Sequence, residues 1–93
     1  MLTPQTKTAL ENTAKNICRQ HHLSQFYFAQ SLGPRRHYLA GYGQQTFNPA
    51  QHLTLSENVV VFWQGTLPDQ ARTLIKQALR PIAQMIEREI SMP

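Results

Sequence analysis

Five consecutive apolar residues, Val59 to Trp63, restrict the fold of this chain more than any other feature of its sequence. A strand with one face in water alternates apolar and polar residues, whereas an unbroken apolar run is typical of a strand covered on both faces. The run is also far too short to cross a membrane. It therefore predicts a central strand, over about residues 58–64, in a sheet that needs cover on both sides.

This run lies inside a longer segment, residues 25–65, which contains all the Phe, Tyr and Trp residues of the chain. Alternating residues predict strands over 25–32 and 36–42, and the Gly-Pro turn between them predicts an antiparallel hairpin. Residues 43–53 are predicted to form a loop. The segment thus predicts a small antiparallel sheet of three strands.

Helical patterns flank the segment on each side. An apolar arc at helical spacing predicts a helix over residues 4–22, with Thr3 as its N-cap. A second helix is predicted over residues 67–90, where the apolar stripe is broad. Pro81 interrupts that stripe, but the pattern resumes in the same phase, which favours a kinked continuous helix.

These elements predict one small α+β domain over residues 1–93, in the order α-β-β-β-α. Either the two helices take opposite faces of the sheet, or the second face meets a loop, a ligand or another subunit. The wide stripe of the last helix predicts homodimerisation, because an exposed apolar patch is otherwise a liability. The residues predicted at the dimer interface are Leu74, Ile75, Leu79, Ile82 and, on the sheet, Trp63.

The formal charge of +4 is unevenly distributed. Residues 1–56 carry the whole excess, and residues 57–93 are balanced. A basic surface attracts acidic proteins, nucleic acid or anionic lipid without selecting among them, and the ordinary alternative is a solvated surface. Arginines on a tight turn are a common anion site, and neighbouring aromatic rings can stack bases. The residues predicted to bind an acidic partner are Arg35, Arg36, His37, Tyr38 and Tyr42.

The sequence contains few residues whose type and spacing suit catalysis or metal binding. Cys18 and His22 have a spacing that can hold a metal, but Cys18 and His21 lie on the apolar arc, which favours core packing. Glu87 and Glu89 diverge on a helix and cannot act as a pair. We therefore predict a non-enzymatic protein without a metal or other cofactor.

The compartment is predicted from what the sequence lacks. Its first residues have no apolar signal segment, and one cysteine cannot form an internal disulfide. No stretch is long and apolar enough to span a membrane. These features predict a cytoplasmic protein.

The chain resembles a shortened GAF domain, a small regulatory module of sensor proteins. Three pieces carry the resemblance: QFYFAQSLGPRRHYLAGYG, with its Ala-Gly pair after the second strand; LTLSENVVVFWQG; and ARTLIKQALRPIAQMIERE, whose end is similar to an Ile-Glu-Arg closing helix. The middle part that grips ligands in GAF domains is missing, as are a bilin-holding cysteine and the charged cyclic-nucleotide motif. The resemblance implies that the dimerising helices remain, and hence a regulatory or adaptor role through protein interaction.

The predicted element order is also that of a double-stranded-RNA-binding domain. The turn Gly33 to His37 is similar to the Gly-Pro-His loop of that family, which enters the minor groove of RNA. The lysine cluster expected at the start of the last helix is absent, and Asp69 would repel a phosphate. RNA binding through this turn is therefore the alternative function.

Overall fold

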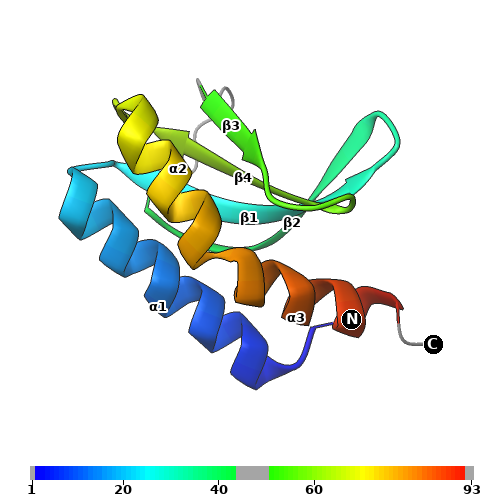
Figure 1. The fold of residues 1–93 in the computed structure, drawn as a ribbon. Coiled ribbons are helices and arrows are strands. Elements are labelled where there is room, and N and C mark those ends of the chain that lie inside the picture. Colours follow the sequence, from blue (N-terminus) through cyan, green and yellow to red (C-terminus); the bar gives the residue numbers. More distant parts are fainter. Residues whose placement is uncertain (1, 44–50, 92–93) are drawn as a thin grey trace.

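The computed structural model describes residues 2–43 and 51–91, and it confirms the α+β class. Figure 1 shows the helices on one side of a strongly twisted sheet. No described helix has the length and apolar character needed to span a membrane. The elements follow along the chain as α1 (Pro4–His21), β1 (Gln25–Leu32), β2 (Arg35–Gly43), β3 (Gln51–Thr54), β4 (Val59–Gln64), α2 (Asp69–Ala78) and α3 (Arg80–Ser91).

The sheet has four antiparallel strands in the order β2-β1-β4-β3. The expectation of three strands was therefore wrong, because β3 lies at the end of the predicted loop. Its four residues include a single apolar one, so the segment has no strand pattern of its own, and it is extended because it pairs with the edge of β4. The central position predicted for Val59 to Trp63 is confirmed, since β4 lies between β1 and β3.

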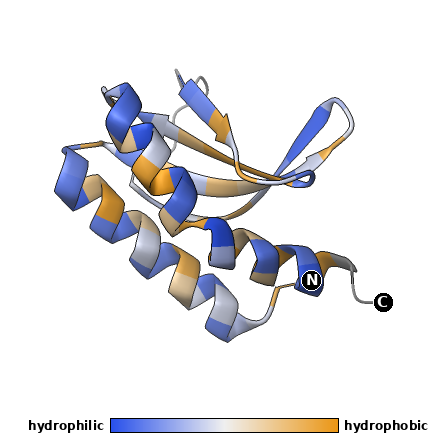
Figure 2. Cartoon of the chain, in the orientation of Figure 1, coloured by the Kyte–Doolittle hydropathy of each residue, from blue (hydrophilic) through white to orange (hydrophobic). Residues whose placement is uncertain are grey.

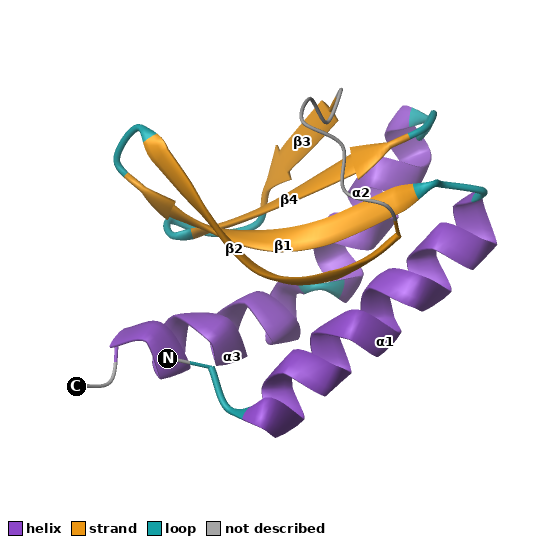
Figure 3. Ribbon diagram, turned by 180° about the vertical axis from the view of Figure 1, so that it is seen from behind, coloured by secondary structure: helices purple, strands orange, loops and turns teal. Residues whose placement is uncertain are grey.

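All three helices lie on the same face of the sheet, which the view from behind in Figure 3 also shows. This excludes the arrangement with one helix on each face: within residues 2–43 and 51–91, no helix covers the other face. The helices are amphipathic, with hydrophobic and hydrophilic stretches alternating along each one in Figure 2. The core forms between their apolar sides and the covered face of the sheet, around Phe26, Phe28 and Trp63.

Local signals explain where α1 begins and ends. The Thr3 Oγ1 accepts a hydrogen bond from the Thr6 amide at 3.2 Å, and Pro4 occupies the first turn, where its missing N–H costs nothing. At the other end His22 adopts the left-handed conformation, with φ of 56°, and its backbone N–H bonds back to the Cys18 carbonyl. Leu10, Ala14, Ile17 and Cys18 of the predicted apolar arc are buried, whereas His21 is only partly buried.

The last helical segment is two helices rather than one kinked helix. Helix α2 ends at Ala78, Leu79 is a single residue between the helices, and α3 begins at Arg80. Pro81 causes the break, because it has no N–H to donate and its ring excludes a regular turn before it. Leu79 stays in the core with 2% of its surface exposed, so the chain changes direction between α2 and α3 at a buried residue.

Two carboxylates hold α3 to the rest of the molecule. Glu87 accepts hydrogen bonds from the Ser56 hydroxyl at 2.9 Å and from the Asn58 side chain at 3.0 Å. Glu89 accepts from the Thr3 amide at 3.0 Å and the Thr6 hydroxyl at 2.6 Å. The two side chains diverge, as their spacing predicts, and fasten α3 to the β3–β4 turn and to the start of α1.

Candidate functional site

The hairpin turn places the predicted basic residues at one end of the sheet. Gly33 has a φ of +61°, which a residue without Cβ adopts readily. Arg35, Arg36 and His37 follow it and are all exposed. The Arg36 guanidinium is partly used by the turn itself, because its Nη1 donates to the Ser31 hydroxyl and the Gly33 carbonyl, each at 3.3 Å. Arg35 and His37 are the freer groups of the three.

Strand register assigns these side chains to different faces. His37 pairs with Gln30 and Arg35 with Leu32, and these partners share a side of β1 with the buried Phe28. Arg35 and His37 therefore lie on the helix-covered side, beyond the reach of the core. Arg36, opposite Ser31, lies on the open side.

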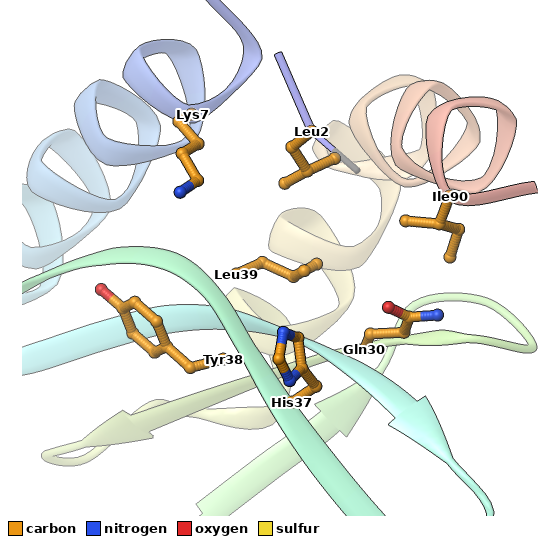
Figure 4. Close-up of a pocket in the computed structure, with 7 residues that line it drawn as sticks. All are labelled: Leu2, Lys7, Gln30, His37, Tyr38, Leu39 and Ile90. Carbon is orange, nitrogen blue, oxygen red and sulfur yellow. The ribbon is translucent and has the colours of Figure 1, made fainter. Parts of the chain in front are cut away.

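A pocket of about 320 Å³ opens where β2, the start of α1 and the end of α3 meet. Figure 4 shows Lys7 reaching into it from α1, and His37 and Tyr38 lining it from β2. Within the described residues, neither the Lys7 ammonium nor the His37 ring has a hydrogen-bond or ion-pair partner. We call this cavity the Lys7–His37 pocket; its lining is Leu2, Lys7, Gln30, His37, Tyr38, Leu39 and Ile90.

Tyr42 does not join the other predicted anion-binding residues. It pairs with Phe26 near the far end of β2, away from the turn. The Lys15 ammonium lies 6.0 Å from the centre of its ring, a cation–π distance. The structure thus places Arg35 to Tyr38 together along β2 but on its two faces, and assigns Tyr42 to a separate contact with α1.

The predicted dimer residues also separate into two groups. Leu74 has 66% of its surface exposed, and Ile82 is partly buried. Ile75 and Leu79 are 6% and 2% exposed and pack inside the protomer, so they contribute little surface to a partner. Trp63 is only 1% exposed, so its placement on an accessible sheet face needs correction.

Trp63 is buried because β4 turns it toward the helices. It stacks with Phe26 at 6.5 Å between ring centres, and the Arg72 guanidinium lies 5.6 Å from its ring. Arg72 is itself fixed by the Leu67 carbonyl at 3.2 Å and by the Gln51 side chain at 2.7 Å. Arg72 of α2 therefore covers the Trp63 indole ring.

A groove of about 420 Å³ runs between α1 and the α2–α3 pair. We call it the helical groove. Leu74 and Ile82 line it together with Ile17 from α1, and no Lys, Arg, Asp or Glu side chain contributes to its lining. The complete lining is Thr13, Asn16, Ile17, Gln20, His21, Leu74, Ile75, Ala78, Leu79 and Ile82.

The face without helices carries an aromatic row that crosses all four strands. Tyr27 lies 5.4 Å from Tyr38 and 5.2 Å from Phe62, between ring centres, and His52 lies 5.8 Å from Phe62. The alternation of β1 predicts the orientation of Tyr27, but its neighbours come from strands whose register no local pattern predicts. Burial raises the pKa of the Tyr27 hydroxyl, and the nearby Tyr38 raises it further.

Gly41 makes this row possible. It pairs with Tyr27, and a Cβ at position 41 would lie 2.2 Å from the Tyr27 Cβ and 2.6 Å from the Phe26 carbonyl oxygen. The Ala40-Gly41 pair within β2 therefore has a packing reason: only glycine at position 41 allows β2 to approach β1 so closely.

Cys18 faces the core, with 4% of its surface exposed, which agrees with the packing interpretation of its position on the apolar arc. Burial raises the pKa of its thiol, so the reactive thiolate is disfavoured. Across residues 2–43 and 51–91, no group of three or more His, Cys, Asp or Glu side chains is arranged to hold a metal ion.

Comparison with family models, curated proteins and solved structures found no match for this chain. The resemblances to GAF and double-stranded-RNA-binding domains therefore stay predictions. Three surfaces are the candidates for function: the basic turn with the Lys7–His37 pocket, the helical groove, and the aromatic row.

Proposed function

We propose that this protein is a small non-enzymatic interaction module, of a regulatory or adaptor kind, that pairs with a second copy and holds an acidic protein partner. The observation that carries the proposal is Leu74, a large apolar side chain that is 66% exposed beside an apolar groove. A single exposed leucine is ordinary, but one that borders a hollow lined by other apolar residues marks a contact surface.

The chemistry of the helical groove favours a second copy as its occupant. Each protomer carries a formal charge of +4, so the repulsion between two copies is smallest where they meet through a surface without charged side chains. The lining of the helical groove has no Lys, Arg, Asp or Glu side chain, so pairing there desolvates no charge. A two-fold arrangement would let Leu74 of each copy enter the groove of the other. The GAF resemblance implies the same use of terminal helices.

The distribution of acidic residues supports an acidic partner at the other end of the molecule. None of the five acidic residues lies on a strand: they occur on the helices and in the β3–β4 turn. Glu87 and Glu89 are already held by hydrogen bonds inside the protein. Arg35 and His37 therefore face solvent without a competing carboxylate on the same strands, and they favour negatively charged partners.

Light scattering coupled to gel filtration tests the pairing. The wild type should elute as a dimer at high protein concentration, and Leu74→Asp should shift it to a monomer by placing a charge in the apolar contact. Gln84→Asp is the matched control, because it adds the same charge at an exposed position of α3 outside the helical groove. A wild type that stays monomeric, or a Leu74→Asp variant that stays dimeric, contradicts the proposal.

RNA binding remains the second candidate, and the observation in its favour is the exposed basic turn with the aromatic row on the open face. Phosphate contacts release counterions, so binding to heparin and duplex RNA would weaken steeply as salt rises. Charge reversal of Arg35 and Arg36 should then abolish retention. Binding that is absent even at low salt eliminates this candidate.

A further inference from the structure

The Lys7–His37 pocket combines charge, hydrogen-bond donors and apolar surface in one small cavity. Lys7 offers an ammonium group, and Gln30 and His37 offer N–H groups at its wall (Figure 4). The rest of the lining includes the apolar residues Leu2, Leu39 and Ile90. A few convergent polar groups over an apolar floor are typical of a ligand site rather than of a solvated surface.

The charges around the pocket select an anion. Among the described residues, the Lys7 ammonium has no carboxylate partner. Glu89, at the end of α3, is bound to Thr3 and Thr6 instead. Arg35 projects from the same side of β2 as His37 and adds to the positive potential. A carboxylate entering here would meet donors without displacing an existing ion pair.

We propose that the Lys7–His37 pocket binds a carboxylate side chain, together with an adjacent apolar side chain, from an acidic segment of a partner protein. The carboxylate lies between Lys7 and His37, and the apolar side chain packs on Leu39 and Ile90. This deepens the proposed function, because it specifies which chemistry of an acidic partner is recognised and where.

Two features favour a peptide segment over a free small acid. The positive charge continues from the pocket to the exposed Arg35, which lies on the same side of β2 as His37. Strand β2 is also an edge of the sheet, the position at which an extended chain can add by strand pairing. The pocket volume of about 320 Å³ is at the lower end of ligand sites, which fits one or two side chains.

The test titrates the intact protein with three short labelled peptides by fluorescence anisotropy. The first alternates Glu and Leu, the second replaces Glu by Gln, and the third replaces Leu by Gly. The first should bind at least ~10-fold more tightly than either of the others, since each control loses one part of the recognition. Hexanoate serves as a competitor, and it should displace the peptide only weakly. Equal binding of all three peptides, or full displacement by hexanoate at peptide concentrations, overturns the proposal.

Variants then locate the site. Lys7→Ala and His37→Gln should each weaken the Glu-Leu peptide, by ~10-fold for the lysine, because a charge-assisted contact is lost. Lys76→Ala is the matched control, since it removes one exposed lysine on α2 outside the pocket. Methyl resonances of Leu39 and Ile90 should shift on binding, a readout that does not depend on variant folding. If Lys7→Ala binds normally, or the shifts appear only elsewhere, the pocket is not the site.

The result is separable from that of the proposed function. Pairing through the helical groove is measured by light scattering without any peptide. Loss of peptide binding on charge reversal of Arg35 and Arg36, with Lys7→Ala and His37→Gln unaffected, would keep an acidic partner and exclude the pocket.

Discussion

The two faces of the sheet use aromatic residues in opposite ways, although the same strands build both. On the helix-covered face Phe26, Phe28 and Trp63 are at most 1% exposed and contact one another in the core. On the open face Phe62 is only partly buried and Tyr38 is 46% exposed. Burial of an aromatic ring here depends on which side the helices occupy, since strand alternation distributes rings to both sides.

The difference between the two faces shows that one face of this small domain supplies most of the stability, whereas the other is left available for contacts with partners. The covered face has the apolar contacts with the helices and therefore most of the hydrophobic stabilisation. The open face keeps rings with polar tips, Tyr27 and Tyr38, in a row whose members shield one another. The surfaces available for partners are those that the helices do not use for the core.

The largest expected effect comes from a matched pair of substitutions on the two faces. Phe28→Ala should lower the free energy of unfolding by about 3–5 kcal/mol, because it leaves a cavity in a fully buried site. Phe62→Ala, on the partly buried face, should cost about 1–2 kcal/mol, since part of its surface is already in water. Urea denaturation of both variants measures the difference. Equal losses would show that the open face is as covered as the other.

A smaller effect is expected at the contact between β1 and β2. Gly41→Ala places a Cβ 2.2 Å from the Tyr27 Cβ, so the strands must separate, at a cost of about 1–3 kcal/mol. The aromatic row should lose its order, which near-ultraviolet circular dichroism detects. Gly33→Ala is the control: its Cβ meets no atom within 4 Å, so only the positive φ is penalised and the row stays intact. An unchanged aromatic spectrum in Gly41→Ala would contradict this account of the row.

The smallest expected effect is a change in the pH dependence of stability, which comes from the contact of Glu87 on α3 with the β3–β4 turn. Burial alone would raise the pKa of Glu87, but hydrogen bonds from Asn58 and Ser56 outweigh it, and the net pKa lies below the ordinary value of 4.5. A carboxyl whose pKa is lower in the folded than in the unfolded state stabilises the fold fully above the unfolded value. That contribution is lost as the pH falls through the folded pKa.

The unfolding free energy should therefore decline below about pH 4.5, and Glu87→Gln should reduce this dependence. The change stays below about 1 kcal/mol, because the group is largely solvated. Denaturation curves at several pH values check it, with Glu57→Gln in the exposed part of the same turn as the control. A Glu87→Gln variant with the wild-type pH dependence would show that protonation of Glu87 does not affect the free energy of unfolding.

Much of the fold was predictable because its signals are local. Strand β1 has the predicted bounds, and β2 and β4 differ by a residue or so at their ends, since alternation and the Gly-Pro turn act within a few residues. The capping of α1 by Thr3 follows from the same kind of signal. The central position of β4 followed from its unbroken apolar run, which is typical of a strand inside a sheet.

The candidate sites were less predictable than the elements that carry them. Arg35 to Tyr38 were identified from the turn, but Lys7 was assigned only to a basic row on a helix. The leucine most exposed in the helical groove, Leu74, was predicted together with Ile75 and Leu79, which face inward. A broad apolar stripe does not show which of its edges remains uncovered.

The sequence alone thus determined the helix and strand periods, the caps and the turns, because these depend on interactions within a few positions. The extra strand β3, the placement of all helices on one face, the inward turn of Trp63 and the meeting of Lys7 with His37 were decided only in the folded molecule. Each of these depends on a contact between segments distant in the chain. Such contacts form only when the whole set of elements packs to bury its apolar faces at once.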